Sequence, residues 1–322
     1  MIVRRYFLCF LCIAILFVLG TSPLSALSEP IDVSRECSLR ICYADNGSGI
    51  SDIEVKIYRI ADTSADAQME LTEEFDDYPV RINSVTSLSE WKDIATTLCS
   101  YISKDGIEPH DTAVTDRSGI AAFEGLETGL YLIYNASAET DNGTFVFDAF
   151  MCHLPTVGTD EYVYDAEMNP KGIEFIPSNE ELEYKVLKLW RDEGRTDDRP
   201  EAVTVDILKD GDIAKTVILN SGNNWSYSWK AVDDGSEWSV VEKDVPDEYY
   251  VSCTVRETSF IITNTIRQAP TDSDPTPPVS DAPQTGDTFP LMWCIVVLCM
   301  SGMLVLVMGV WSMRGKTNAA KK

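Results

Sequence analysis

Nine cysteines and two histidines are the residues of this 322-residue chain that could bind a metal or form disulfides. Four of the cysteines lie in apolar runs close to the two ends of the chain. The other five are irregularly spaced and include no CxxC pair, so they predict neither a disulfide framework nor a metal site. We expect no metal and no cofactor, and thiols that are buried or only opportunistically paired, with the pairing left open: Cys37, Cys42, Cys99, Cys152 and Cys253.

Other catalytic patterns are also lacking in the sequence. The histidines, His110 and His153, do not belong to a Ser/His/Asp set, and no glycine-rich nucleotide loop occurs. A surface enzyme is therefore the function class with the least support.

The N-terminus has the three zones of a secretory signal peptide. Arg4 and Arg5 supply positive charge, residues 6–20 are apolar, and small residues lead to a cleavage site before Glu29. The alternative, a first transmembrane helix, is less favoured because the apolar run is short and leads into turn residues. We predict a signal peptide over residues 1–28.

The C-terminus has an uncharged run long enough to cross a bilayer, residues 289–313. Basic residues follow it, which predicts a cytoplasmic tail and places everything between the two apolar runs outside the membrane. These tail residues are Arg314, Lys316, Lys321 and Lys322.

The predicted exported part is strongly acidic. Residues 29–285 carry 51 acidic and 20 basic side chains, a net charge of −31. Such a surface repels nucleic acid and anionic lipid, so we expect neither as a partner.

The chain after a linker at 172–182 has the pattern of a β-sandwich. Short runs with strand alternation are separated by turn signals such as Lys209-Asp210-Gly211, which is typical of antiparallel sandwiches. The runs are 184–190, 202–208, 214–219, 225–229, 238–242, 249–255 and 260–263.

This second unit, 183–265, resembles the collagen-adhesin (Cna) B-type domain, the immunoglobulin-like repeat of Gram-positive surface proteins. The matching residues occur in order along the whole unit. They are 188–192, 199–200, 203–205, 208–211, 224–227, 238–242, 245–246, 249 and 262–265.

The resemblance implies a self-formed isopeptide bond from Lys188 on the first strand to Asn264 on the last, with Glu242 as the proton shuttle. A lysine amine at its reference pKa of about 10.4 is protonated and cannot attack a carboxamide. Burial lowers that pKa and raises the pKa of a carboxyl, so a neutral amine and a protonated acid can coexist. Glu242 can then move protons while fixed strands supply proximity. The alternative is a solvent-facing lysine and an exposed carboxylate.

The preceding unit, 29–171, combines strands at 38–43 and 53–60 with a helix over 87–102. Ser87 and Glu90 fit a capping box, and Gly106 follows the end of the helix. One face is apolar, which indicates packing on a core rather than a partner-binding surface. The residues of that face are Leu88, Trp91, Ala95, Leu98 and Ile102.

Residues 115–123 and 125–132 resemble the turn-and-hairpin signature of prealbumin-like B-type domains and N-terminal pilin domains. Gly119 serves the turn, and Phe123, Leu126 and Tyr131 are expected to pack inward. The fold class is therefore all-β, with tandem immunoglobulin-like or prealbumin-like sandwiches, the first with an inserted helix.

In pilin shaft subunits, a lysine after a proline at the end of this domain accepts the next subunit. Lys171 follows Pro170 at that place, although the residues before it depart from the usual pattern. The alternative for Lys171 is a solvated turn. Cys42 stands where a bond-forming domain would show lysine, so we expect no isopeptide bond in the first unit.

Residues 282–287 resemble the sorting signal of sortase substrates, Leu-Pro-any-Thr-Gly before an apolar span and a basic tail. Pro283, Gln284, Thr285 and Gly286 fit, while Ala282 replaces the usual leucine and leaves the sortase class open. The resemblance implies attack by a sortase cysteine on the Thr285 carbonyl and transfer of Thr285 to an amine.

Two function classes follow from these features. The first is a structural pilin that a sortase joins to other subunits or to the peptidoglycan cross-bridge of a Gram-positive wall. The second is a monomeric wall-anchored adhesin or stalk with an unknown surface ligand. The Pro-, Asp-, Ser- and Thr-rich linker at 266–282 fits both, and the pilus position stays open.

Anchoring can be tested at the sorting motif. Changing Thr285 or Gly286 is expected to move the protein from the wall fraction to the membrane or the medium, because the acyl-enzyme cannot form. Immunoblots of the cell fractions measure this. A variant that remained covalently bound to peptidoglycan would place the sorting signal elsewhere.

Overall fold

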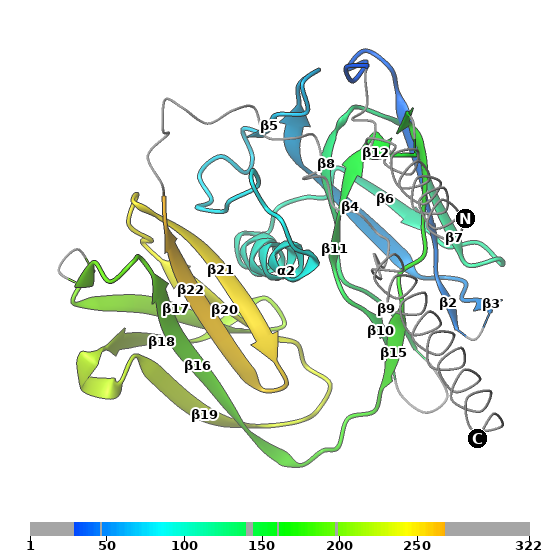
Figure 1. Ribbon diagram of the computed structural model, residues 1–322. Helices are drawn as coiled ribbons and strands as arrows, with labels where there is room; N and C mark the ends of the chain where they lie inside the picture. Colours follow the sequence, from blue (N-terminus) through cyan, green and yellow to red (C-terminus); the bar gives the residue numbers. More distant parts are fainter. Residues whose placement is uncertain (1–28, 46, 140–143, 160, 197–198, 268–322) are drawn as a thin grey trace, which may run out of the picture. The chain divides into compact units, whose positions relative to one another are not determined.

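The computed structural model describes residues 29–45, 47–139, 144–159, 161–196 and 199–267, all within one compact unit of the chain. They form two β-sandwiches and one long helix (Figure 1). No helix among these residues is long and apolar enough to cross a membrane. The predicted signal peptide, sorting motif and span lie outside the described residues, as does all but the first two residues of the linker predicted at 266–282.

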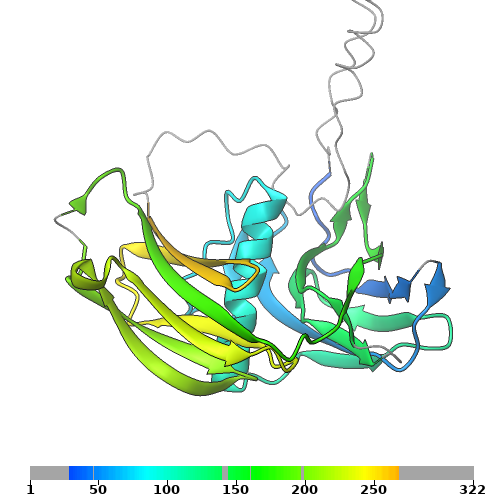
Figure 2. The same ribbon diagram turned by 90° about the horizontal axis from the view of Figure 1, so that it is seen from below.

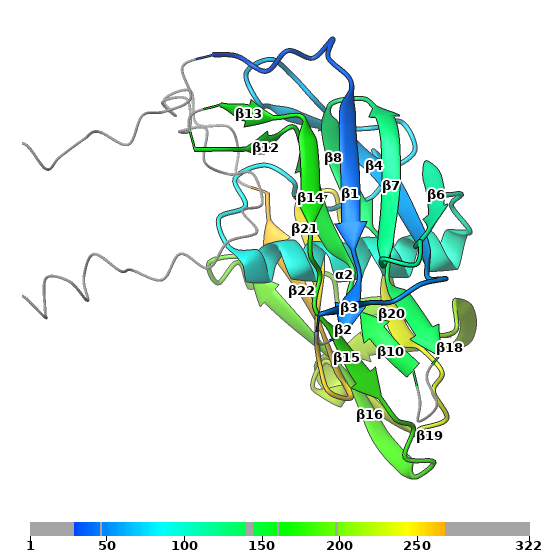
Figure 3. The ribbon, with the colours of Figure 1, turned by 90° about the vertical axis from the view of Figure 1, so that its right-hand side faces the viewer.

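The first sandwich pairs a three-stranded sheet with a larger one. In the smaller sheet, β1 lies between β14, to which it is parallel, and β7, to which it is antiparallel (Figure 3). The larger sheet has the order β11-β8-β4-β5, with β6 also paired to β4. The bounds are β1 Cys37–Cys42, β4 Glu54–Thr63, β5 Met69–Leu71, β6 Asp111–Val114, β7 Ile120–Leu126, β8 Gly129–Ile133, β11 Phe150–Leu154 and β14 Asp165–Met168.

Short strands complete this sandwich. Strand β15 pairs with β10, so the segment predicted as linker, 172–182, begins with a strand. The remaining short strands form the pairs β2–β3, β9–β10 and β12–β13. The bounds are β2 Ala44–Asp45, β3 Ser48–Gly49, β9 Ala136–Glu139, β10 Thr144–Phe147, β12 Thr156–Val157, β13 Tyr162–Val163 and β15 Gly172–Phe175.

The turn before β7 requires glycine. Gly119 has φ +78°, and a Cβ there would lie 2.2 Å from the backbone oxygen of Tyr43. The turn delivers Phe123 and Leu126 into the core, and Tyr131 on β8 joins them, with all three side chains buried. The inward packing predicted for these three residues is confirmed.

The predicted helix is confirmed as α2, Leu88–Asp105. The Ser87 hydroxyl accepts from the Glu90 N–H at 3.2 Å, which caps the first turn. Gly106 ends the helix in the left-handed conformation and donates to the Ile102 carbonyl at 2.9 Å.

The apolar face of α2 lies in the core of the first sandwich. Trp91, Ala95, Leu98 and Ile102 are buried against strands of the larger sheet. Leu88, the first residue of the helix, was predicted on this face, but it is 59% exposed, so the prediction is wrong for this residue. A second side of α2 contacts the second sandwich (Figure 2).

The second sandwich consists of one sheet with the order β19-β16-β22-β21 and one with the order β18-β17-β20. All seven predicted strand runs are confirmed. The first strand, β16, is parallel to the last, β22, so the two ends of the domain lie on adjacent strands. The bounds are β16 Glu181–Arg191, β17 Ala202–Lys209, β18 Asp212–Asn220, β19 Ser226–Val232, β20 Trp238–Lys243, β21 Tyr249–Arg256 and β22 Ser259–Ile266.

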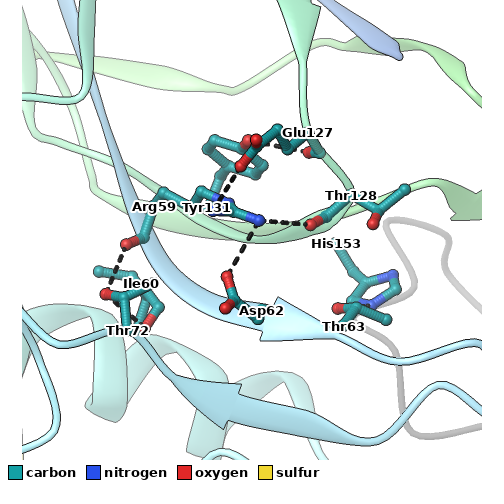
Figure 4. A network of polar contacts seen from close by, with 9 residues as sticks. All are labelled: Arg59, Ile60, Asp62, Thr63, Thr72, Glu127, Thr128, Tyr131 and His153. Atoms are coloured by element: carbon teal, nitrogen blue, oxygen red, sulfur yellow. Dashed lines mark hydrogen bonds and ion pairs between the residues drawn. The ribbon is translucent and has the colours of Figure 1, made fainter. Parts of the chain in front are cut away.

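A polar network crosses the larger sheet of the first sandwich (Figure 4). Arg59 on β4 forms ion pairs with Asp62 at 2.9 Å and Glu127 at 2.6 Å, and it donates to the Thr128 carbonyl at 3.1 Å. These contacts join β4 to the turn between β7 and β8.

His153 lies buried at the end of the same network. Its Nδ1 is 2.9 Å from the Pro155 carbonyl, which can only accept, so Nδ1 carries the proton. Nε2 then accepts from the Thr63 hydroxyl at 2.9 Å. Burial lowers the pKa of His153, so the folded protein holds a neutral imidazole.

This depressed pKa predicts a loss of stability in acid. The unfolded state takes up the His153 proton near the reference value of 6.5, while the folded state does not. Above that pH neither state binds this proton, and the contribution of His153 to the free energy of unfolding is fully present. As the pH falls below it, the free energy of unfolding decreases by up to about 1.4 kcal/mol per pH unit. Chemical denaturation over a pH series measures it, and His153→Gln is expected to remove this part of the slope.

The exposed histidine provides the matched control. His110→Gln makes the same substitution at a histidine that is exposed and makes none of the buried contacts of His153 with Pro155 and Thr63. Equal slopes for His153→Gln and the wild type would contradict the assignment.

Candidate functional site

The site lies inside the second sandwich, where strand alternation turns Lys188 inward. Tyr184, Val186 and Lys188 on β16 are buried, while the residues between them are more exposed. On β22, Phe260, Ile262 and Asn264 occupy the inner face. Because Lys188 pairs with Ile262 and Trp190 with Asn264, the lysine and the asparagine are diagonal neighbours in one sheet.

Glu242 reaches the same place from the facing sheet. It lies on β20, where Val240 and Glu242 are both buried, and it pairs with Val205 of β17. The predicted triad is therefore brought together by the two layers of the sandwich, with two members from one sheet and one from the other.

The three side chains are in contact. The Lys188 Nζ lies 3.1 Å from Glu242 Oε2, and Asn264 Nδ2 donates to Glu242 Oε1 at 2.8 Å. Exposure is 2% for Lys188, 3% for Glu242 and 0% for Asn264. Glu242 thus bridges an amine and a carboxamide with no access to bulk water.

Burial shifts both ionisable groups toward neutrality. Desolvation lowers the pKa of Lys188 to about 8, against the raising effect of the Glu242 charge. Desolvation likewise raises the pKa of Glu242, against the lowering effect of Lys188. Because both shifts follow desolvation, the apolar surroundings outweigh the mutual attraction, and the pair can hold a neutral amine beside a protonated acid.

Asn264 Oδ1 is buried without a hydrogen bond among the described residues, and the partner of the buried Glu242 Oε2 is the Lys188 amine at 3.1 Å. Buried polar atoms are nearly always hydrogen-bonded, so such exceptions often mark functional sites. Asn264 Oδ1 is the carbonyl oxygen on which charge would develop if an amine attacked the carboxamide. A proton on Glu242 Oε2 could serve that oxygen.

Aromatic and charged residues enclose the amine. The Lys188 Nζ lies 4.3 Å from the centroid of the Trp190 ring and donates to the Leu189 carbonyl at 3.3 Å. Beyond the ring, Arg199 donates to both carboxylate oxygens of Asp192, at 2.6 and 2.8 Å. The Arg199 charge lowers the pKa of Lys188 and the Asp192 charge raises it, so the two members of this ion pair act on the amine in opposite directions.

Tyr101 is a residue near the site that the sequence reasoning missed. It lies on α2, and its hydroxyl is 3.5 Å from the backbone oxygen of Glu242. Asp93, Thr97 and Tyr101 recur at every fourth position of the helix. This spacing was the available signal for a second contact face.

The other candidate residues are separate from the triad. Lys171 is exposed between β14 and β15 of the first sandwich, and Cys42 is partly buried on β1. All five cysteines in the described part are free thiols. The described ranges contain no group of His, Cys, Asp and Glu residues arranged to hold a metal.

The fold and the triad together define an immunoglobulin-like sandwich with a buried Lys-Glu-Asn set. Residues 184–265 match the family described as the Cna protein B-type domain, which confirms the resemblance drawn from the sequence. The collagen adhesin of Staphylococcus aureus is 33% identical over 78 residues, which is 24% of this chain and 7% of that protein. The similarity therefore covers one domain of a much longer relative.

Solved structures of Gram-positive surface proteins are also similar. A single B repeat unit of the S. aureus collagen-binding protein Cna aligns over 73% of this chain and 99% of its own length, with 16% identity and a TM-score of 0.26. The major pilin SpaD of Corynebacterium diphtheriae aligns over 73% and 65%, with 15% identity and a TM-score of 0.29. The T6 backbone pilin of Streptococcus pyogenes aligns over 54% and 39%, with 14% identity and a TM-score of 0.30.

Proposed function

We propose that the chain is a structural subunit of a sortase-assembled pilus on a Gram-positive surface, with a Lys188–Asn264 isopeptide bond in its second sandwich. The main observation in support of this bond is the buried contact of Lys188 and Asn264 with Glu242. The match of residues 184–265 to the Cna B-type family supports the same reading.

The proposed reaction joins the Lys188 and Asn264 side chains and releases one molecule of ammonia. A proton passes from the Lys188 ammonium to Glu242, which leaves a neutral amine. Nζ then forms a bond to Cγ of Asn264 while Glu242 donates to the carbonyl oxygen. Glu242 then relays a proton from the attacking nitrogen to Nδ2, the Cγ–Nδ2 bond breaks and ammonia leaves, and the oxygen returns its proton to Glu242 as the C=O bond re-forms. The only catalysis in this proposal is the formation of the chain's own bond.

The position of the bond suits a protein under tension. Strands β16 and β22 are parallel neighbours, so pulling on the two ends of the domain shears them past each other. A covalent link between Lys188 and Asn264 would take that load in place of the hydrogen bonds between the strands.

Assembly in this proposal uses two further groups. A sortase would cleave after Thr285 and transfer its carbonyl to an amine of another subunit or of the peptidoglycan cross-bridge. Lys171 is the proposed acceptor, because it is exposed between β14 and β15 of the first sandwich, beside Pro170. The subunit would then be covalently held at the cell wall.

A monomeric wall-anchored adhesin is the second candidate. The observation that favours it is the 33% identity to a collagen adhesin over 78 residues. An adhesin would use the same anchor and the same internal bond, and it would differ in forming no polymer.

The internal bond is tested by intact mass. A chain of residues 29–267, which keeps both sandwiches, is expected to be lighter than its sequence by one ammonia, and Glu242→Ala to restore the full mass. Lys188→Ala is expected to lower the free energy of unfolding by roughly 4 kcal/mol, the loop-entropy value for a cross-link closing a loop of this length.

Lys185→Ala is the matched control, since Lys185 is an exposed lysine on the same strand. This variant is expected to lose ammonia as the wild type does. A full, unmodified mass in folded wild-type protein would refute the bond.

Polymerisation is tested at Lys171 in cells. Boiled wall extracts are expected to show a ladder of high-mass species on denaturing gels. Lys171→Ala removes the acceptor amine and is expected to collapse the ladder to monomer, whereas Lys188→Ala leaves it largely intact. A single wild-type band would favour the adhesin, and a ladder that survived Lys171→Ala would assign another acceptor.

A further inference from the structure

The second sandwich has an open side between its two sheets. Strand β21 is the outer strand of one sheet and β20 is the outer strand of the other. An outer strand exposes backbone groups that need a partner or a cover. Glu242 of the triad lies on β20, one of these two outer strands.

The first sandwich supplies that cover through α2 and the loop before it. The Val251 N–H of β21 donates to the Pro79 carbonyl at 2.7 Å, and the Cys253 N–H donates to the Thr97 hydroxyl at 2.8 Å. The Thr254 hydroxyl donates to Asp93 at 2.8 Å. The N–H groups of two alternate residues on this edge are therefore satisfied by another part of the chain.

The first sandwich makes one more polar contact with the second, at Glu237, which immediately precedes β20. Asn135 donates to the Glu237 carboxylate at 2.8 Å. The same asparagine accepts from the Ala149 N–H at 2.9 Å, which fixes its orientation. Both outer strands of the second sandwich are therefore in contact with the first sandwich. Strand β21 contacts α2 and the loop before it, and the start of β20 contacts the segment after β8.

Tyr101 fills the space between these two edges. Although it belongs to α2, its ring packs with the apolar core of the second sandwich, and it is only 6% exposed. Its ring centroid lies 4.5 Å from that of Tyr78, and its hydroxyl lies 3.5 Å from the Glu242 carbonyl. Burial and the nearby Glu242 both raise the pKa of Tyr101, so the phenol stays neutral.

We propose that Tyr101 is a positioning residue for the Lys188–Asn264 bond, closing the β20–β21 side of the sandwich so that Glu242 and Lys188 face no water. This inference rests on the proposed function, because it concerns the rate at which that bond forms. A side chain of the first sandwich would then govern a reaction inside the second.

The physical reason is the sensitivity of the reacting pair to solvent. A neutral amine beside a protonated acid is favoured only where charged forms are poorly solvated. Water admitted beside Glu242 would stabilise the charged ammonium and carboxylate and so deplete the neutral amine and protonated acid that react. The reaction would therefore proceed at its full rate only after the two sandwiches have docked.

The test compares the rate of ammonia loss in chains of residues 29–267 collected soon after synthesis and followed by intact mass. Tyr101→Ala is expected to slow the loss on the order of tenfold, the effect of a one-unit change in pKa on the neutral fraction. Tyr101→Phe keeps the ring and is expected to react at the wild-type rate. If Tyr101→Ala does not fold, Tyr101→Leu, which lacks the breadth of a ring, takes its place.

A pH series separates this role from a general loss of stability. The reacting form holds a neutral amine and a protonated acid, so the rate falls at low pH, where Lys188 is protonated as well, and at high pH, where Glu242 loses its proton. Admitting water raises the pKa of Lys188 from about 8 and lowers that of Glu242, so it lowers the maximum rate and widens the pH range over which that maximum extends. The other charged groups that act on the pair or on Tyr101 are unchanged in every variant. These titratable groups are Asp192, Arg199, Tyr78, Asp105 and Cys253.

Thr97→Val is the matched control on the same helix. It removes the hydrogen bond to Cys253 but keeps the Tyr101 ring, and it is expected to show the wild-type rate and pH profile. Wild-type kinetics in folded Tyr101→Ala or Tyr101→Leu would overturn the inference, as would equal slowing by Thr97→Val. A wild type that never loses ammonia would instead refute the bond itself.

Discussion

The contact between the Lys188 amine and the Glu242 carboxyl, buried in an apolar sandwich, is the constraint on which the rest of the structure depends. An ion pair in such a place is costly, because desolvation of the two charges can exceed their attraction. The shifts of both pKa values toward neutrality show that desolvation dominates here. The pair is therefore better suited to transferring a proton than to holding two charges, and the Asn264 carboxamide is hydrogen-bonded to the same Glu242 carboxyl.

This constraint explains features that would otherwise be independent. The two sheets must face each other closely enough for Glu242 to reach between Lys188 and Asn264, and β16 must adjoin β22. The open side of the sandwich must also be closed. Thr97 and Tyr101 of α2 lie on that side, so the helix serves the core of the first sandwich and the edge of the second.

Local signals in the sequence predicted most of the fold. The Ser87 cap, the Gly106 terminus and the alternation of β16 depend on neighbouring residues, and the structure confirms each of them. The contact of Tyr101 with Glu242 joins residues 141 positions apart, so it depends on how the two sandwiches pack and not on local pattern. Strand β15 was missed for a related reason, because it is defined by its pairing with β10. The triad was predicted by family resemblance, and periodicity alone would have shown only that Lys188 turns inward.

The most direct measurement is peptide mapping of the purified protein by tandem mass spectrometry after proteolysis. The account predicts one branched peptide in which the β16 segment containing Lys188 is joined to the β22 segment containing Asn264, with fragment ions that place the link at those two side chains. Recovery of the two segments only as separate, linear peptides from folded protein would contradict it.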